Sequence, residues 1–363
     1  MAFFAVTVET IDVVNPIPNA DRIEMATLKG KDFQFVIAKG SFAPSDRCLY
    51  FPVDSIVPSD LIEKMGLTGK LSGKNKDRVK TVKLRGQISQ GLVAKLDIIP
   101  DTAINMIPTM SPEAFTALIG VTKYDPPEIP CNDGILKPLP DGQSMYDIEG
   151  ADRYTEIAER LMNEPVFITE KLEGTNFSIQ VKTGLTDAYQ SVFVSSRRNT
   201  IIEKPDVENS FWKAARRQKL IEFAKTLCET SGKDVVVYGE LIGPGIQKNI
   251  YGLKEQEVRI FDIKRGGKWV EPNLMVKLVL AFFDVDGMRE RPIPIVPYIF
   301  SGNLRDFLKG KTIKQASDGP SFLKADQKRE GIVIRPQAES EVEGFGRLIL
   351  KQRSPEYLSE SDT

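Results

Sequence analysis

The stretch "VFITEKLEGTNFSI", residues 166–179, decides how the second half of this chain folds. Its first residues are apolar, and Phe177 and Ile179 alternate with polar residues, so a strand is predicted on each side of its polar centre. Lys171 ends the first strand, and Gly174 is expected to let the backbone turn toward the second. Taken alone, the pattern favours a solvated lysine in a hairpin turn over a nucleophile, because a lysine three residues before a glycine is common by chance.

The composition restricts the chemistry that this chain can perform. Its 363 residues are enough for two domains, and its net charge is −1. It has no histidine, which excludes His-dependent acid–base catalysis, a Ser–His–Asp triad and His-ligated zinc. Its three cysteines, Cys48, Cys131 and Cys228, are far apart and indicate reduced thiols, not a disulfide framework or a thiolate metal site. Catalysis would therefore depend on Lys, Arg, Asp, Glu or an oxygen-bound metal.

The chain shows neither a signal peptide nor a membrane span. Its N-terminus, "MAFFAVTVETIDVV", lacks a basic region before a long apolar run, and it alternates as a half-buried strand would. No run approaches the roughly 18 apolar residues that a span requires. We expect no membrane partner and a cytoplasmic location by default, with the nucleus or an organelle left open.

Residues 1–122 consist of short strand-like segments separated by Gly and Pro, which predicts a small OB-like β-barrel. Within it, Lys64 to Arg85 contains eight basic residues and one acidic residue. Two interpretations are open from charge alone. The segment is either a solvated loop with a lysine-blunted edge strand, or a patch that contacts nucleic-acid phosphates.

A composition change follows the barrel. Five prolines lie within residues 126–140 and predict a semi-rigid linker. Beyond it, strand patterns alternate with helical ones at 154–162, 208–232, 271–285 and 301–310. The fold class is therefore α+β, with a first domain at 1–125, a linker at 126–150 and a second domain at 151–363.

Several later segments place chemically suitable side chains at strand ends or in turns. Each has an ordinary interpretation, such as a surface charge, a core aromatic or an edge-strand lysine. Their coincidence favours one shared site. The side chains are Arg197 at a strand end, Glu240 in a Gly-rich turn, Phe261 within a strand, Glu330 and Arg335 at the two ends of a strand, and Lys351 and Arg353 on one face of the last strand.

In combination these segments resemble the covalent nucleotidyltransferase superfamily, which comprises ATP-dependent DNA and RNA ligases and mRNA capping enzymes. "KLEG" at 171–174 is similar to its K-x-[DE]-G motif, and "SSRRN", "YGE", "VRIFDI", "EGIVIRP" and "LILK" follow in the order of its later motifs. The resemblance covers residues 165–353. It implies a nucleotidyltransferase domain, ATP-grasp-like, of antiparallel sheets with flanking helices.

The domain order narrows the resemblance to one branch. DNA ligases and capping enzymes carry an OB domain after the last motif, whereas only ten residues follow Arg353 here, and we expect no further domain there. The barrel first, with "EKLEGTN" and "GELIGPGIQKN", resembles the RNA ligases with an N-terminal OB domain known from Deinococcus and Naegleria. One departure is Lys351-Gln352-Arg353, where many relatives have two lysines around one residue.

The resemblance implies a role for each matching residue. Lys171 would attack the α-phosphate of ATP to form lysyl–AMP; AMP would pass to an RNA 5′-phosphate, and a 3′-hydroxyl would displace it. Only the neutral amine attacks, so Mg²⁺ or Mn²⁺, with Arg335, Lys351 and Arg353, would lower the lysine pKa. Nucleotide contacts would come from Glu170, Leu172, Glu173, Asn176, Arg197, Glu240, Phe261, Glu330, Lys351 and Arg353. Metal would be held, mainly through water, by Glu173, Glu240 and Glu330, and RNA by Lys74, Lys76, Arg78, Lys80, Lys83 and Arg85.

The expected function is thus an ATP-dependent RNA ligase that seals 3′-hydroxyl and 5′-phosphate ends. Two alternatives are another covalent nucleotidyltransferase, either a DNA ligase or a GTP-specific capping enzyme, and a non-catalytic OB-containing RNA-binding protein. The expected partners are RNA, as a nicked duplex, paired ends or an RNA–DNA hybrid, and end-healing enzymes. A monomer is expected. The sequence leaves open which RNA is sealed and what Glu170 does.

Overall fold

A computed structural model describes residues 4–124, 133–184, 192–284 and 292–361 of the chain, so Cys131 lies outside the described residues. The chain forms two compact units. The first consists of Ala2–Pro127 with Ala151–Thr155 and Pro355–Thr363, and the second mainly of Glu128–Gly150 with Glu156–Ser354. In the described residues, no helix is long and apolar enough to cross a bilayer.

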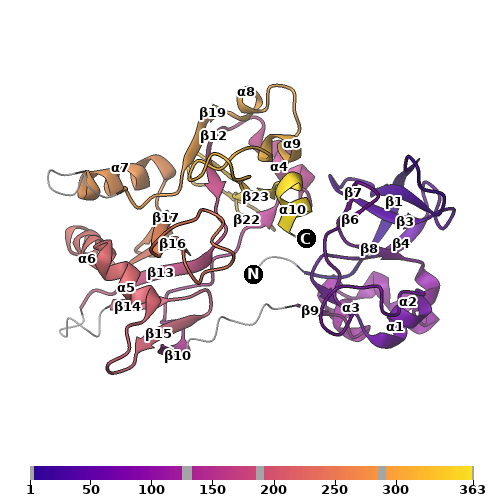
Figure 1. Ribbon diagram of the computed structural model, residues 1–363, viewed down its shortest axis with the longest axis horizontal. Coiled ribbons are helices and arrows are strands. Elements are labelled where there is room, and N and C mark those ends of the chain that lie inside the picture. Colours follow the sequence, from indigo (N-terminus) through magenta and orange to yellow (C-terminus); the bar gives the residue numbers. More distant parts are fainter. Residues whose placement is uncertain (1–3, 125–132, 185–191, 285–291, 362–363) are drawn as a thin grey trace. The chain divides into compact units, whose positions relative to one another are not determined.

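The first unit is the predicted small barrel (Figure 1). Its five-stranded sheet has the order β3-β2-β1-β4-β8, with β1 at Thr7–Pro16, β2 at Ile23–Leu28, β3 at Gln34–Ala38, β4 at Arg47–Phe51 and β8 at Leu92–Ala94. Two-stranded pairs are formed by β5 (Ser55–Ile56) with β9 (Thr122–Lys123) and by β6 (Val82–Leu84) with β7 (Gln87–Ser89). Short helices, which sequence periodicity did not reveal, are α1 (Ser59–Lys64), α2 (Asp101–Met106), α3 (Pro112–Leu118) and α10 (Pro355–Ser361).

Strand β4 is the centre of this unit because both of its faces are buried. Cys48 and Tyr50 point into one apolar cluster, together with Phe35 of β3. Leu49 and Phe51 point into a second cluster, which α1, α2 and α3 cover. Alternate residues of a strand point to opposite faces, so one five-residue strand serves both cores.

The second unit contains two large sheets. The seven-stranded sheet has the order β10-β15-β14-β13-β16-β17-β18: β10 (Gly134–Pro138), β15 (Asn199–Glu203), β14 (Val192–Ser195), β13 (Thr175–Val181), β16 (Val235–Ile242), β17 (Glu257–Arg265) and β18 (Lys268–Trp269). The five-stranded sheet has the order β11-β23-β20-β12-β19: β11 (Glu149–Gly150), β23 (Leu350–Arg353), β20 (Gly331–Pro336), β12 (Pro165–Lys171) and β19 (Tyr298–Asn303). Strands β21 (Glu341–Val342) and β22 (Gly346–Arg347) form a separate pair.

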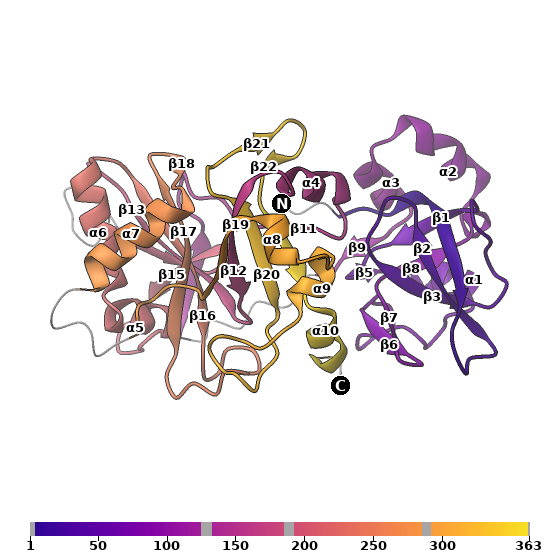
Figure 2. The same cartoon turned by 90° about the horizontal axis from the view of Figure 1, so that it is seen from above.

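Helices cover one face of the seven-stranded sheet. Alternate residues such as Phe177, Ile179 and Val237 pack there in an apolar core with α5 (Ser210–Arg217), α6 (Leu220–Ser231) and α7 (Pro272–Phe283). Figure 2 shows these helices on one side of the sheet and the five-stranded sheet, with β12 and β20, on the other. The remaining helices are α4 (Thr155–Leu161), α8 (Leu304–Leu308) and α9 (Ile313–Ser317).

The opposite face of the seven-stranded sheet is polar although it is buried. Ser178, Gln180, Ser195 and Asp262 are all at most 1% exposed. Residues 141–147, which we call the 141–147 segment, satisfy part of this face with three hydrogen bonds: Gln143 Nε2 to Ser178 Oγ at 2.6 Å, Gln180 Nε2 to the Asp141 carbonyl at 3.1 Å, and the Tyr238 hydroxyl to the Ser144 carbonyl at 3.4 Å.

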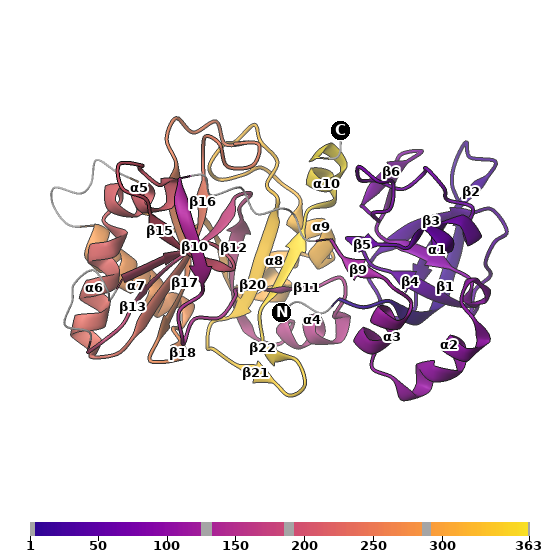
Figure 3. The same ribbon diagram turned by 90° about the horizontal axis from the view of Figure 1, so that it is seen from below.

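Three sequence expectations need correction. The helix expected over 301–310 is confined to α8, because residues 301–303 belong to strand β19. The helix expected over 208–232 is two helices, because Lys219 adopts a left-handed conformation between α5 and α6; its end at the left-handed Gly232 is confirmed. In the stretch expected to be a linker, the described part is built into the second unit. It supplies the sheet-edge strand β10 beside β15 (Figure 3), the 141–147 segment and β11. Backbone pairing with the sheets holds it, so it is not a spacer there.

Candidate active site

Lys171 lies where the chain passes from one sheet to the other. Strand β12 ends at Lys171 in the five-stranded sheet, and β13 begins at Thr175 in the seven-stranded sheet. The two strands therefore do not form the hairpin that the local pattern favoured. The connection is held by Leu172, which is buried in a small apolar cluster, and by the Glu173 backbone N–H, which donates to the Tyr251 hydroxyl at 2.7 Å.

Gly174 is needed in this connection for space and not for an unusual backbone angle. A Cβ at this position would lie 2.5 Å from the Leu241 carbonyl oxygen and 2.7 Å from Glu240 Cγ. Its φ is outside the left-handed range, so Gly174 does not serve the tight turn that the sequence predicted. Its missing side chain instead lets the connection lie close to β16. This approach brings Lys171 and Glu240 into one site.

The five-stranded sheet aligns three cations on one face. Lys171 pairs with Gly331, and Gly331 pairs with Arg353 on the other side. Two residues farther along β20, Val333 pairs with Lys351 of β23. Directly opposed residues and residues two apart share a face, so Lys171, Lys351 and Arg353 project from the same side. Val333, an apolar and partly exposed residue that the sequence analysis missed, lies among them.

Glu330 connects two of these cations. Its Oε2 accepts a hydrogen bond from Lys171 Nζ at 2.7 Å, and its Oε1 lies 3.6 Å from Arg353 Nε. The Glu330 side chain is only 10% exposed, so both ion pairs are partly shielded from water. One carboxylate therefore holds both the Lys171 amine and the Arg353 guanidinium in place.

Glu240 is the second carboxylate beside Lys171. It pairs across strands with Asn176, and paired residues point to the same face. Burial raises its pKa from 4.5 to about 8; Lys171 and Arg197 oppose the rise and Glu330 adds to it. Glu240 and Glu330 lie close together, and burial opposes ionisation of Glu240. A bound cation would offset the repulsion between their charges and stabilise the ionised pair.

Arg197 and Glu173 are oriented by neighbouring loops. Arg197 forms an ion pair with Asp147 of the 141–147 segment, while its Nε is buried and has no hydrogen-bond partner in the described part of the chain. Glu173 Oε1 accepts a hydrogen bond from the Lys248 backbone N–H at 3.2 Å. The unsatisfied Nε indicates that an acceptor, such as a phosphate or hydroxyl oxygen, belongs there.

Phe261 lies at a bulge in β17. Ile260 pairs with Gly239 and Asp262 pairs with Tyr238, so Phe261 has no opposite residue in the ladder. Its ring is partly exposed and contacts the Tyr146 ring at a centroid distance of 4.8 Å. The Phe261 ring therefore lies beside Tyr146 of the 141–147 segment.

Three predicted residues have structural partners instead. Glu170 points to the opposite face of β12 from Lys171 and is 1% exposed; its Oε2 accepts from the Phe322 backbone N–H at 2.8 Å. Burial raises the Glu170 pKa, and Ser321 and Phe322 oppose the rise. Leu172 is a core residue, so only its backbone can reach a nucleotide. Arg335, expected beside Lys171, donates to Asp262 Oδ1 at 3.0 Å at the far end of β20.

Asp262 is the centre of a buried network that sequence reasoning missed. It accepts hydrogen bonds from Arg335, from Arg347 at 2.6 Å and from the Tyr146 hydroxyl at 2.6 Å. Burial acts to raise the pKa of Asp262, but Arg335 and Arg347 hold it below its ordinary value. The arginines and Asp262 are 73 or more residues apart, so no local motif marks them.

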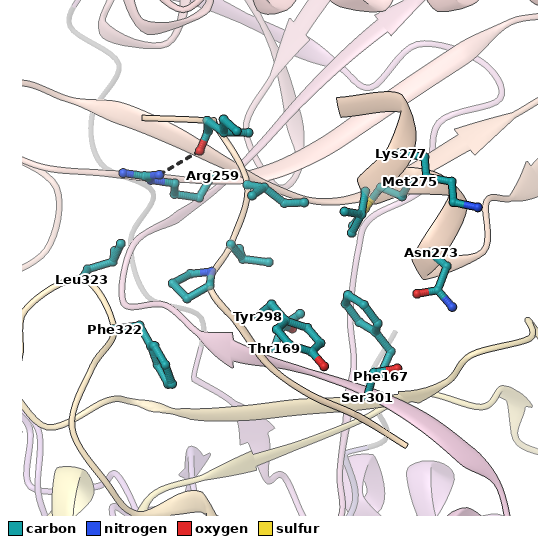
Figure 4. Close-up of a pocket in the computed structure, with 15 residues that line it drawn as sticks. Phe167, Thr169, Arg259, Asn273, Met275, Lys277, Tyr298, Ser301, Phe322 and Leu323 are labelled. Carbon is teal, nitrogen blue, oxygen red and sulfur yellow. Dashed lines mark hydrogen bonds between the residues drawn. The ribbon is translucent and has the colours of Figure 1, made fainter. Parts of the chain in front are cut away.

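A separate apolar pocket of about 680 Å³ lies in the second unit between α7 and the β12–β19 pair (Figure 4). Phe167, Met275, Tyr298 and Phe322 line it, and Figure 4 shows Arg259 bonded to a backbone carbonyl at its edge. The residues predicted to bind nucleotide or metal are not among its lining residues. Among the described residues, no cluster of three or more carboxylates and thiols is close enough to hold a metal ion by itself.

The basic segment of the first unit divides into two groups. Lys74, Lys76, Lys83 and Arg85 are exposed, as the RNA-contact prediction requires. Arg78 is not available: it pairs with Asp54 at 2.6 Å, and its guanidinium lies 3.5 Å from the centroid of the Tyr124 ring. Lys80 is half-buried and already has an interaction partner. The predicted contribution of these two residues to RNA contact is therefore not supported.

Comparisons with known proteins match both units. The RNA ligase family model matches residues 164–353, and an OB-fold domain model matches residues 5–96. No curated protein matches the chain. Among solved structures, Naegleria gruberi RNA ligase with PPi is 26% identical over 100% of both chains, with a TM-score of 0.78. A substituted form of that ligase with ATP and Mn is 27% identical over 98% of both chains, with a TM-score of 0.77.

Proposed function

The chain belongs to the RNA ligase family, and from this premise we propose that it joins RNA ends with ATP through a covalent lysyl–AMP intermediate on Lys171. The Naegleria ligase that it resembles was solved with ATP or AMP and Mn, which supports ATP and a divalent metal as its requirements. The first unit would bind the nucleic acid. The second unit would carry out the transfer of AMP.

One observation supports this assignment above the others: Lys171 Nζ lies 2.7 Å from Glu330 Oε2, on a sheet face shared with Lys351 and Arg353. A surface lysine would not need a shielded acid and two further cations beside it. The acid positions the Lys171 amine, and Lys351 and Arg353 offer contacts for the phosphate that the amine would attack. The neutral amine is the form that attacks phosphorus.

The donor set fits a nucleotide and a hard cation. Glu240 and Glu330 offer carboxylate oxygens beside Lys171, and Mg²⁺ or Mn²⁺ prefers such ligands. When bound, the metal would neutralise charge on the α-phosphate and lower the pKa of the attacking amine. Glu173 would add a ribose or metal-water contact, and Asn176 would help to orient Glu240.

The nucleotide would extend from Lys171 toward the polar face. Phe261 offers a partly exposed ring on which a base can stack. Arg197, with its unsatisfied Nε, is suited to an oxygen of the nucleotide or of the RNA strand. Lys351 and Arg353 are suited to the α-phosphate. Glu170 would then act indirectly, by fixing residues 321 and 322 against β12.

Each step of the proposed reaction balances. Lys171 Nζ, as the neutral amine, forms a bond to the α-phosphorus and loses one proton to solvent; the bond from that phosphorus to the bridging oxygen breaks, and pyrophosphate leaves. The RNA 5′-phosphate then attacks the same phosphorus, and Lys171 leaves as the amine, which takes up a proton. Finally a 3′-hydroxyl attacks the RNA 5′-phosphorus and gives its proton to solvent, and AMP leaves.

Labelling tests the nucleophile. Incubation with α-³²P-ATP and Mn²⁺ or Mg²⁺ should label the protein with an acid-labile, alkali-stable phosphoramidate. Lys171→Ala should abolish the label, while Lys182→Ala, a lysine just beyond β13, should keep it. A fully labelled Lys171→Ala protein would remove Lys171 from the mechanism. Labelling by GTP would instead favour a capping-type enzyme.

Sealing assays test the substrate. Nicked duplexes whose 3′-hydroxyl and 5′-phosphate strands are independently RNA or DNA separate an RNA ligase from a DNA ligase. We further propose that the chain acts as a monomer, and light scattering would measure its mass in solution. We propose that it acts in the cytoplasm. End-healing enzymes would produce the 3′-hydroxyl and 5′-phosphate before it acts. RNA binding without labelling or sealing would support the non-catalytic alternative.

A further inference from the structure

We propose that Tyr146 is a positioning residue that holds the Phe261 ring in the orientation in which it receives the nucleotide base. This inference rests on the proposed function and deepens it. Tyr146 belongs to the 141–147 segment, which the sequence pattern marked only as linker. It touches Phe261 directly, with ring centroids 4.8 Å apart and planes inclined at 51°.

Phe261 needs such support because the sheet does not fix it. At the bulge, the ladder passes from the Ile260–Gly239 pair to the Asp262–Tyr238 pair, and Phe261 is the extra residue. A bulged residue lacks an opposite partner, so its direction is less determined than that of its neighbours. A Cβ on Gly239 would lie 2.6 Å from Val258 Cγ1, so no side chain opposite the bulge can supply the support.

Tyr146, in contrast, is held on several sides. Its hydroxyl donates to Asp262 Oδ2 at 2.6 Å, and its ring packs against Tyr238 at 5.2 Å and edge-on against Trp269 at 5.6 Å. Arg347 lies 4.1 Å from the centroid of the Trp269 ring and also bonds to Asp262. Tyr146 is therefore a fixed support for Phe261, in addition to the apolar cluster of Leu172, Ile242, Tyr251 and Val296 against which Phe261 also packs.

The same network reaches the Phe261 backbone. Arg335 donates to Asp262 Oδ1 at 3.0 Å and to the Phe261 carbonyl at 3.3 Å. Asp262 therefore anchors both the hydroxyl that fixes Tyr146 and the arginine that fixes the Phe261 main chain. Arg335 thus has a role in the site, although not the phosphate contact that its position in the sequence suggested.

A double-mutant cycle tests whether Tyr146 acts through Phe261. The variants are Tyr146→Leu, Phe261→Leu and the double variant. Tyr298→Leu is the matched control, because it makes the same change at an exposed tyrosine whose ring contacts Phe167 and not this cluster. Binding is measured with α,β-methylene-ATP, which cannot transfer AMP to Lys171, and, as a base-free probe, with pyrophosphate. An aromatic pair contributes about 0.5–1.5 kcal/mol, so Tyr146→Leu should lower the affinity for the nucleotide about two- to twelvefold. The affinity for pyrophosphate should not change. In the Phe261→Leu background, Tyr146→Leu should have no further effect on the affinity for the nucleotide.

A spectroscopic signal gives a second readout. 2-Aminopurine riboside triphosphate loses fluorescence when its base stacks, and Tyr146→Leu should restore part of that fluorescence. Tyr146→Phe, which keeps the ring and folds more readily, should give a smaller change in the same direction. Equal losses of affinity for α,β-methylene-ATP and for pyrophosphate, or an undiminished effect in the Phe261→Leu background, would overturn the proposal. Because binding is measured without turnover, a wild-type protein that binds α,β-methylene-ATP but forms no lysyl–AMP from ATP would contradict the proposed function alone.

Discussion

The raised pKa of Glu240 predicts that nucleotide binding releases a proton. Glu240 has a pKa of about 8 because it is buried beside Glu330. At pH 7 only about a tenth of the protein would carry the carboxylate, and a divalent cation or its bound water favours that form. Binding of the metal–nucleotide complex should therefore release about 0.9 proton at pH 7 and almost none at pH 9. The apparent affinity for the metal–nucleotide complex should rise about tenfold per pH unit below pH 8 and level off above it.

Calorimetry measures this release directly. Metal-saturated α,β-methylene-ATP, in which the bond that Lys171 would break is replaced, is titrated into the protein in two buffers of different ionisation heat. The difference between the two observed binding heats, divided by the difference between the two buffer ionisation heats, gives the number of protons released. Glu240→Gln should abolish the buffer dependence, and Glu173→Gln, which leaves Glu240 in place, should keep it. Equal heats for the wild-type protein, or undiminished release by Glu240→Gln, would refute the reasoning.

Stability should depend on pH in the corresponding way. The folded-state pKa of Glu240 lies above its ordinary value of 4.5, so between pH 4.5 and about 8 the folded protein binds more protons than the unfolded chain. The free energy of unfolding therefore falls as pH rises through this window. Glu240→Gln should weaken the decline, which urea titrations at pH 5.5 and 8.5 would detect.

Three further predictions concern other parts of the molecule. Gly174→Ala should lower the free energy of unfolding by about 1–3 kcal/mol in urea titrations, because its Cβ would lie 2.5 Å from the Leu241 carbonyl oxygen. Arg335→Met should cost about 3–5 kcal/mol in the same assay, because it leaves the buried Asp262 with one cation fewer. Lys83→Ala with Arg85→Ala should reduce the salt slope of RNA binding by about 2 in anisotropy titrations, whereas Arg78→Ala should lower the melting temperature and leave that slope unchanged.

The sequence was sufficient for the two strands that flank Lys171. An apolar run marks β12 and alternation marks β13, and both are present. It was not sufficient for their connection, because two strands with a short polar link look the same in a hairpin and in a passage between sheets. The difference depends on what each strand pairs with: β12 with β20, and β13 with β16. Those partners lie far away in the sequence.

Long-range partners also explain the residues that sequence reasoning missed or misplaced. Tyr146 follows a proline-rich stretch and looks like part of a spacer, but its hydroxyl bonds to Asp262, 116 residues later. Arg335 shares the parity of Val333 and was expected beside Lys171, yet it lies at the other end of β20 and pairs with the buried Asp262 carboxylate. Parity gives the face of a strand; only the tertiary partner gives the position along it.

The geometry around Glu330 bears on the arginine that replaces a lysine at the last motif. Glu330 Oε2 bonds to Lys171, and its Oε1 faces Arg353 at 3.6 Å, so one carboxylate restrains two cations at rest. An arginine always carries its charge and offers several donors in a fixed plane, so it can keep a contact with Glu330 while turning another donor to a phosphate. A lysine offers a single charged nitrogen, so both partners would have to approach the same atom. Arg353 therefore suits a site in which the acid must release Lys171 without leaving a second cation unpaired.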